Sequence, residues 1–157
     1  MWRATRAAAA AFALIGGAVL LLVAALTVIS VIGRWLQSTP VPGDIELVQL
    51  GTAAALALFL PYCQLHGSHL IVDIFTARTT TSAQRRLDRV AQLLATSVLG
   101  LLALRAGAGV ADLRAAGETS MVLGLPLWLA YAAMVPSLAL AALIALLSAW
   151  RPEAETK

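Results

Sequence analysis

The sequence carries little charge for its length. Only 12% of its 157 residues are Asp, Glu, Lys or Arg, whereas 61% are hydrophobic. A soluble domain of this size carries about twice that charged fraction. Apolar runs long enough to cross a bilayer, which takes about 20 residues, explain the deficit. The composition therefore predicts an integral membrane protein.

Cysteine and histidine are also scarce. The single cysteine, Cys63, can form neither an internal disulfide nor a Cys-x-x-Cys redox or zinc motif. The only histidines, His66 and His69, lie three residues apart in one connection, so they cannot ligate one haem from opposite sides. A bis-histidine haem anchor is therefore not expected.

A metal site at the same connection is an alternative. His66, His69 and Asp73 have the i, i+3, i+7 spacing of one helical face. Gly67 and Ser68 interrupt that register, and closed zinc sites need four ligands. We favour a polar corner, in which Asp73 acts as a cap or salt-bridge partner, and we expect no metal and no cofactor.

Basic residues form no stripe with interleaved aromatic side chains, so no nucleic-acid partner is expected despite the net charge of +3. Acidic residues are absent from all the apolar runs, in which Arg105 is the only charged residue. A proton or ion pathway normally needs such an intramembrane acid. No internal repeat is visible either, so neither independent transport nor enzymatic activity is expected.

The apolar runs predict an all-α integral membrane protein of four transmembrane helices. A short amphipathic or interfacial segment is expected between the second and third spans. Asp44 is predicted to cap the second span, and Pro61 to kink it. The prediction is a single four-helix membrane domain, residues 1–157, with spans at about 9–32, 46–65, 89–110 and 122–148.

Basic residues predict the direction of the spans. Four spans place both termini on one side, and eight of the eleven Lys and Arg residues lie at the termini or between the second and third spans. By the positive-inside rule that side is cytoplasmic. Both termini are therefore expected in the cytoplasm.

Four short motifs follow one another in the chain, at the ends of the predicted spans. They are Gly33-Arg34; Pro42-Gly43-Asp44-Ile45-Glu46-Leu47; Gly67, His69, Val72 and Asp73; and Gly117-Glu118-Thr119 followed by Pro126, Trp128, Tyr131 and Pro136. In this order the motifs resemble those of the small membrane (DctQ-like) subunit of tripartite ATP-independent periplasmic (TRAP) transporters. Many members have adjacent glutamates at the second motif, where this chain has Asp44 and Glu46, and a basic residue in place of Ile71.

The resemblance implies a non-catalytic scaffold subunit. In this family a large multi-span (DctM-like) subunit moves the solute, often an organic acid, by cation-coupled import, and a periplasmic (DctP-like) protein binds it first. The small subunit supports the large one and helps to dock the binding protein. Carried over to this chain, the resemblance assigns partner-interface or structural roles to Arg34, Asp44, Glu46, Gly67, His69, Asp73, Glu118 and Pro126.

Two other functions remain open on the sequence alone. One is a small membrane anchor of a respiratory oxidoreductase, and the other is an orphan structural protein with four spans. Five charged residues near the predicted span ends are candidates for steering a periplasmic partner: Asp44, Glu46, Asp112, Arg114 and Glu118. Solvated loop charges are the more common explanation for such residues.

Overall fold

The structure, a computed structural model, describes residues 2–37, 41–66 and 81–150, with backbone only for 37 and 81–85. Its four long helices are α1 (Trp2–Gln37), α2 (Asp44–Leu65), α4 (Thr81–Ala116) and α5 (Trp128–Ala149). All four are long and apolar enough to cross a membrane. The predicted all-α fold with four spanning helices is confirmed.

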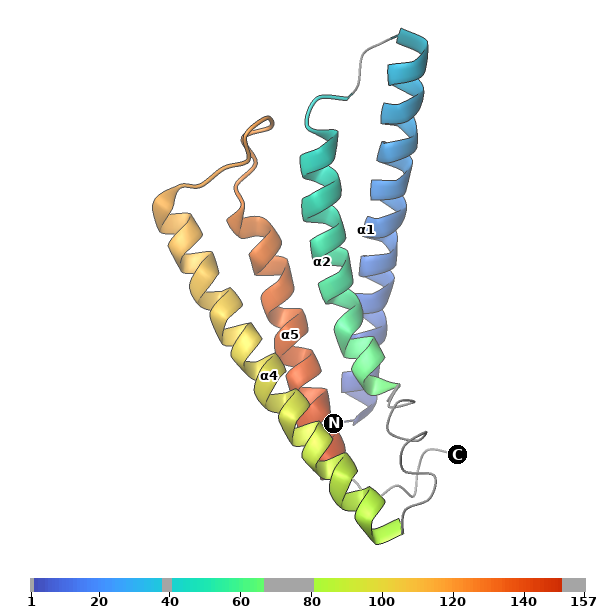
Figure 1. Cartoon of the computed structure of the whole chain (residues 1–157), viewed down its shortest axis with the longest axis vertical. Coiled ribbons are helices and arrows are strands. Elements are labelled where there is room, and N and C mark those ends of the chain that lie inside the picture. The colour runs from blue at the N-terminus through green and yellow to red at the C-terminus, as the bar shows by residue number, and fades with distance from the viewer. Residues whose placement is uncertain (1, 38–40, 67–80, 151–157) are drawn as a thin grey trace.

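The helices lie side by side in the order α1, α2, α5, α4 (Figure 1). The main contacts join α1 to α2, α2 to α5 and α5 to α4, while α1 touches α5 only slightly. Each helix therefore packs mainly on its neighbours in a row. Helix α5, the last in the chain, occupies an inner position of that row between α2 and α4.

The seam between α2 and α5 contains the small, buried residues Ala57 and Ser137. Other buried residues of the two helices are Leu58 of α2, which faces Gly16 of α1, and Ala141, Ile144 and Ala145 of α5. Association between membrane helices depends on such close packing, since lipid is as apolar as the side chains themselves. A polar contact crosses the same seam, where the hydroxyl of Ser137 donates a hydrogen bond to the Ala57 carbonyl.

Glycines bring α1 and α2 together. A Cβ on Gly16 would lie 3.0 Å from the carbonyl oxygen of Ala55, and one on Gly51 would lie 2.5 Å from Cγ2 of Val23. In contrast, a Cβ on Gly100 or Gly107 of α4 would meet no described atom within 4 Å. Gly16 and Gly51 thus serve close packing between α1 and α2, whereas those two positions of α4 lie in open space.

One helix boundary differs from the prediction. The expected fourth span, 122–148, begins too early, because α5 starts only at Trp128 and residues 117–127 form a connection. Gly124 has a positive φ of 65°, and Pro126 has no amide hydrogen to donate. Both features interrupt a helix, although the side chains around them are as apolar as those of a span. Pro61 lies inside α2, which continues to Leu65.

Candidate functional site

The polar side chains that the motifs single out gather at one end of the molecule. This end, called here the hairpin end, carries the end of α1, the start of α2, and the connection from α4 to α5 (Figure 1). Residues 117–127 of that connection form a small hairpin. The described start of the chain and the C-terminal ends of α2 and α5 lie at the opposite end.

Asp44 joins α1 to α2 at the hairpin end. Its Oδ2 accepts a hydrogen bond from the hydroxyl of Ser30 and forms an ion pair with Nη2 of Arg34 at 3.3 Å. Ser30 is almost fully buried, while the Arg34 side chain is 60% exposed. Because Ser30 and Arg34 are one helical turn apart, they present both donors on one face of α1. The predicted residues Arg34 and Asp44 are therefore brought together.

Asp44 does not cap α2 in the predicted way. Gly43 precedes the first helical residue, and its carbonyl accepts the first helical hydrogen bond, from the amide of Leu47 at 3.1 Å. Asp44 is itself helical, and its Oδ1 accepts from the adjacent amide of Ile45 at 2.8 Å. The predicted N-cap position is wrong by one residue, because Gly43 takes the left-handed backbone conformation that lets the chain enter the helix.

Glu46 binds the backbone of the hairpin. Its Oε1 accepts a hydrogen bond from the amide of Val122 at 2.8 Å, and its Oε2 accepts from the amide of Leu123 at 3.1 Å. Hydrogen bonds to an ionised carboxylate are the stronger kind. One side chain at the start of α2 thereby holds the tip of a connection that lies 76 residues further along the chain.

The hairpin is also held together internally. The amide of Ser120 donates to the carbonyl of Leu125 at 2.8 Å, and the hydroxyl of Ser120 accepts from the amide of Leu125 at 3.1 Å. An isolated antiparallel bridge joins Thr119 to Pro126. These bonds satisfy backbone groups of residues that lie outside the helices. The tip therefore has a defined conformation.

Gly43 and Leu123 form a second contact between α2 and the hairpin. A Cβ on Gly43 would lie 2.4 Å from Cγ of Leu123, so the leucine side chain occupies the space that a larger residue would need. The hairpin tip therefore packs on the residue before α2 and is hydrogen-bonded to Glu46 within the first turn of that helix.

The remaining predicted residues have different surroundings. Glu118 is exposed, and its backbone carbonyl accepts a hydrogen bond from the amide of Leu127 at 3.2 Å. Arg114 lies over the ring of Trp128, with its guanidinium carbon 5.3 Å from the centroid. The predicted residues Gly67, His69 and Asp73, and the predicted interfacial segment, lie outside the described residues.

Ser30 is a component of the site that the sequence did not single out. It was visible only as one of two polar residues in a long apolar run, with Thr27. Its spacing of four residues from Arg34 is the signal that could have identified it, since that spacing places both side chains on one helical face. For Ser120 no comparable signal existed, because its role depends on the shape of the hairpin.

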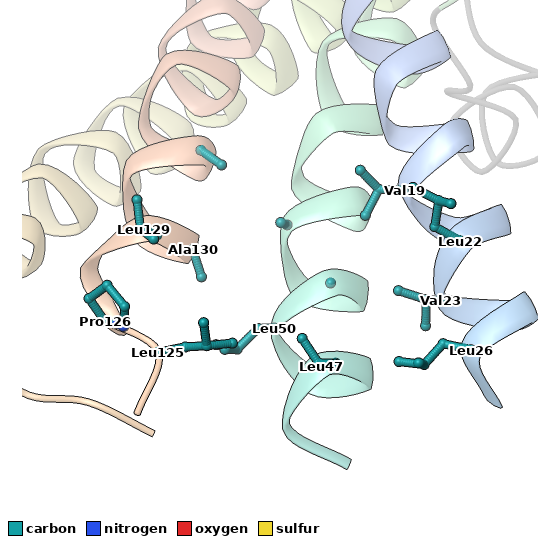
Figure 2. Close-up of a pocket in the computed structure, with 13 residues that line it drawn as sticks. Val19, Leu22, Val23, Leu26, Leu47, Leu50, Leu125, Pro126, Leu129 and Ala130 are labelled. Carbon is teal, nitrogen blue, oxygen red and sulfur yellow. The ribbon is translucent and has the colours of Figure 1, made fainter. Parts of the chain in front are cut away.

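An apolar groove of about 500 Å³ lies next to these polar contacts. Figure 2 shows its walls, with Val19 and Val23 of α1 facing Leu129 of α5 across Leu47 and Leu50 of α2. All of its lining residues are Val, Leu, Ala, Gly or Pro. With no polar side chain to orient a ligand, the groove can accept hydrocarbon but has no residue that could perform acid–base chemistry.

Metal binding has no support in the described part of the chain. Within residues 2–37, 41–66 and 81–150, no group of three or more His, Cys, Asp or Glu side chains could hold a metal ion. The polar side chains of the hairpin end are instead used in contacts between helices and the hairpin. The arrangement can fix one end of the protein as a rigid surface.

These observations define a small all-α membrane protein with four spanning helices and a fixed polar end. The family model for "Tripartite ATP-independent periplasmic transporters, DctQ component" matches residues 23–154. The chain belongs to this family, and the resemblance seen in its motifs is confirmed. It is a TRAP transporter small membrane subunit, a multi-pass protein of the bacterial inner membrane. No curated protein and no solved structure gives a significant match.

Proposed function

We propose that the chain is the non-catalytic scaffold of its transporter. It supports a large DctM-like subunit in the membrane and helps a soluble, DctP-like substrate-binding protein to dock. Cation-coupled import of a solute, such as an organic acid, then takes place through the large subunit. The match to the family over residues 23–154 is the observation that carries this proposal.

The absence of acidic residues from the apolar runs supports a scaffold role. Arg105 is the only charged residue between the ends of these runs. Coupling to protons or sodium ions in a membrane normally uses carboxylates that face the interior of the bundle. A chain without them depends on a partner for the transport step.

The distribution of basic residues supports an orientation with both termini in the cytoplasm. Within the described residues, Arg34, Arg105 and Arg114 lie nearer the hairpin end, and Arg3, Arg6, Arg86 and Arg89 lie nearer the opposite end. By the positive-inside rule, the hairpin end then faces the periplasm. In that orientation it is the part of the subunit that a periplasmic protein can reach.

The hairpin tip is suited to contact such a protein. Met121 is fully exposed and Val122 is largely exposed, although both are apolar. Glu46 holds the backbone of the tip in place, so binding would cost little conformational entropy. We place the docking contact of the binding protein on Met121 and Val122.

His69 and Asp73 are proposed to lie on the cytoplasmic side and to contact the large subunit. They belong to the motif that follows the second span. An Asp73→Ala variant is expected to reduce assembly or uptake while the affinity of the binding protein for its solute stays unchanged. Normal uptake with a normal yield of complex would contradict this role.

Purification and uptake measurements test the scaffold proposal. The wild-type chain should bring a large multi-span subunit with it out of detergent-solubilised membranes. In proteoliposomes holding both subunits, uptake should require the soluble binding protein, and Met121→Glu should reduce it without reducing the yield of complex. A chain that purifies alone under mild conditions would contradict the scaffold role. Unchanged uptake with Met121→Glu would contradict only the docking contact.

A further inference from the structure

Arg105 is a charged residue on the open face of the longest apolar part of α4. Its side chain is exposed, and in the most apolar window of this helix no residue is buried within the chain. The uncharged stretch 90–104 is 15 residues long, or about 22 Å, which is shorter than the hydrocarbon layer of about 30 Å. The span must therefore include Arg105.

Contacts with the neighbouring helices define how deep Arg105 lies. Gln64, next to the end of α2, donates a hydrogen bond from Nε2 to Oε1 of Gln92 at 2.8 Å. At the other end of α4, Arg114 lies against Trp128, the first residue of α5. Residues 92–114 of α4 therefore span the interval between these two contacts, beside α5, which is 22 residues long and thus about 33 Å.

Within that interval Arg105 is far from both edges. It lies nine residues, or about 14 Å, from Arg114 and thirteen residues, or about 20 Å, from Gln92. Side chains leave an α-helix toward its N-terminus, which for Arg105 means away from the nearer edge. Reaching the headgroups at the hairpin end would therefore require the side chain to turn back along the helix.

The surroundings of Arg105 on this face are apolar. Leu94, Val98 and Leu101 precede it at helical spacing, and each is more than half exposed. The next acid on the same stripe is Asp112, seven residues on, and the only ion pair within the described residues joins Arg34 to Asp44. A guanidinium facing lipid at this depth is costly, and residues of this kind normally pair with an acid or line a protein interface.

We propose that this face of α4 packs against a membrane helix of the large subunit, and that Arg105 pairs there with a carboxylate of that helix. The proposal rests on the proposed scaffold function and names the surface that performs it. Leu94, Val98 and Leu101 supply the apolar contact around the charge. The partner is identified by charge complementarity, because lipid chains could cover the leucines but would leave the guanidinium unpaired.

Co-purification with the large subunit tests the proposal. Arg105→Leu should reduce the amount of large subunit recovered per small subunit roughly tenfold, and Arg105→Lys should retain part of it. The span becomes more apolar with leucine, so the level of the small subunit in the membrane should stay the same. An equal recovery with Arg105→Leu would overturn the proposal.

A matched control moves the charge without changing its depth. The double variant Leu104→Arg/Arg105→Leu keeps the composition and shifts the guanidinium about 100° around α4 onto another exposed position. If Arg105 pairs with one carboxylate, this variant should behave like Arg105→Leu. If it assembles like wild type, the arginine serves lipid headgroups and the proposal fails.

Crosslinking gives a measurement that does not depend on altering Arg105. In a Cys63→Ser background, Leu101→Cys and Ala108→Cys flank the arginine and should each crosslink to the large subunit in intact membranes. If the complex forms but neither position crosslinks, this inference alone is wrong. If wild type recovers no large subunit at all, the scaffold function and this inference fail together.

Discussion

The hydroxyl of Ser137 in α5 donates a hydrogen bond to the backbone carbonyl of Ala57 in α2. Ala57 lies four residues before Pro61, and a proline has no amide hydrogen to close the helical bond at that position. The carbonyl that Pro61 leaves without a helical donor is thus satisfied by a fully buried serine of the neighbouring helix. In a membrane this matters more than in water, since no solvent replaces a missing partner.

Ser137→Ala should therefore destabilise the protein by about 1 kcal/mol, the usual value of a hydrogen bond between membrane helices. The free energy of unfolding in detergent checks this. In a Pro61→Ala background, the amide of residue 61 can donate to the carbonyl of Ala57. The decrease in unfolding free energy caused by Ser137→Ala should then be clearly smaller. Equal losses in both backgrounds would show that the serine does not compensate for the proline.

Glu46→Gln should release the tip of the hairpin. A neutral amide has only one carbonyl oxygen to offer the two backbone amides that the carboxylate now serves. Hydrogen exchange at the amides of Val122 and Leu123 should become roughly tenfold faster, because fewer bonds then oppose local opening.

The matched control for this change is Glu118→Gln. Glu118 is an exposed acid at the base of the same hairpin, and its known contacts are made by its backbone. Exchange at Val122 and Leu123 should stay as in wild type. A similar acceleration in both variants would mean that overall charge, and not the Glu46 contact, controls the tip.

Gly43→Ala should destabilise the junction between α1 and α2 by about 1–3 kcal/mol. Its φ of 74° strains any residue with a Cβ, and the new atom would also lie 2.4 Å from Leu123. Thermal unfolding in detergent measures the loss. Gly17→Ala, where nothing lies within 4 Å of the new Cβ, should be neutral or slightly stabilising, since alanine favours a helix over glycine.

Gly51→Ala should separate α1 from α2, because its Cβ would lie 2.5 Å from Cγ2 of Val23. Overpacking of this kind costs about 1–3 kcal/mol. Adding Val23→Ala should recover most of the lost stability, which thermal unfolding of the double variant would show. Failure of the second change to help would place the strain elsewhere in α2.

Hydropathy alone was sufficient to predict the four helices, because each apolar run is about as long as a bilayer requires once the third is continued past Arg105. It failed at residues 122–127, where apolar side chains accompany a left-handed glycine and a proline. A hydropathy average over a window of residues does not show that the backbone leaves the helical conformation within that window. The contacts of Pro126 and Thr119 could be recognised only once the hairpin was known.

The candidate site was predictable only in part. Arg34, Asp44 and Glu46 were selected as motif residues, and the first two do meet. The partners of Glu46 could not be named, because they are backbone amides 76 and 77 residues away. Backbone amides do not differ between residue types other than proline, so no sequence motif identifies them. Ser137 was hidden for a similar reason, since its acceptor is a carbonyl exposed by a proline in another helix.

The position of α5 also constrains how the protein is made. Of the four described helices, α5 is synthesised last. It is nevertheless the helix on which α4 mainly packs, and it lies between α4 and α2. During synthesis α1 and α2 can pair early, while α4 waits in the bilayer without its main neighbour. Insertion of α5 between two helices already in the membrane is then the step that completes the row of four helices. A stop codon shortly before Trp128 would leave a helical pair and a separate single span.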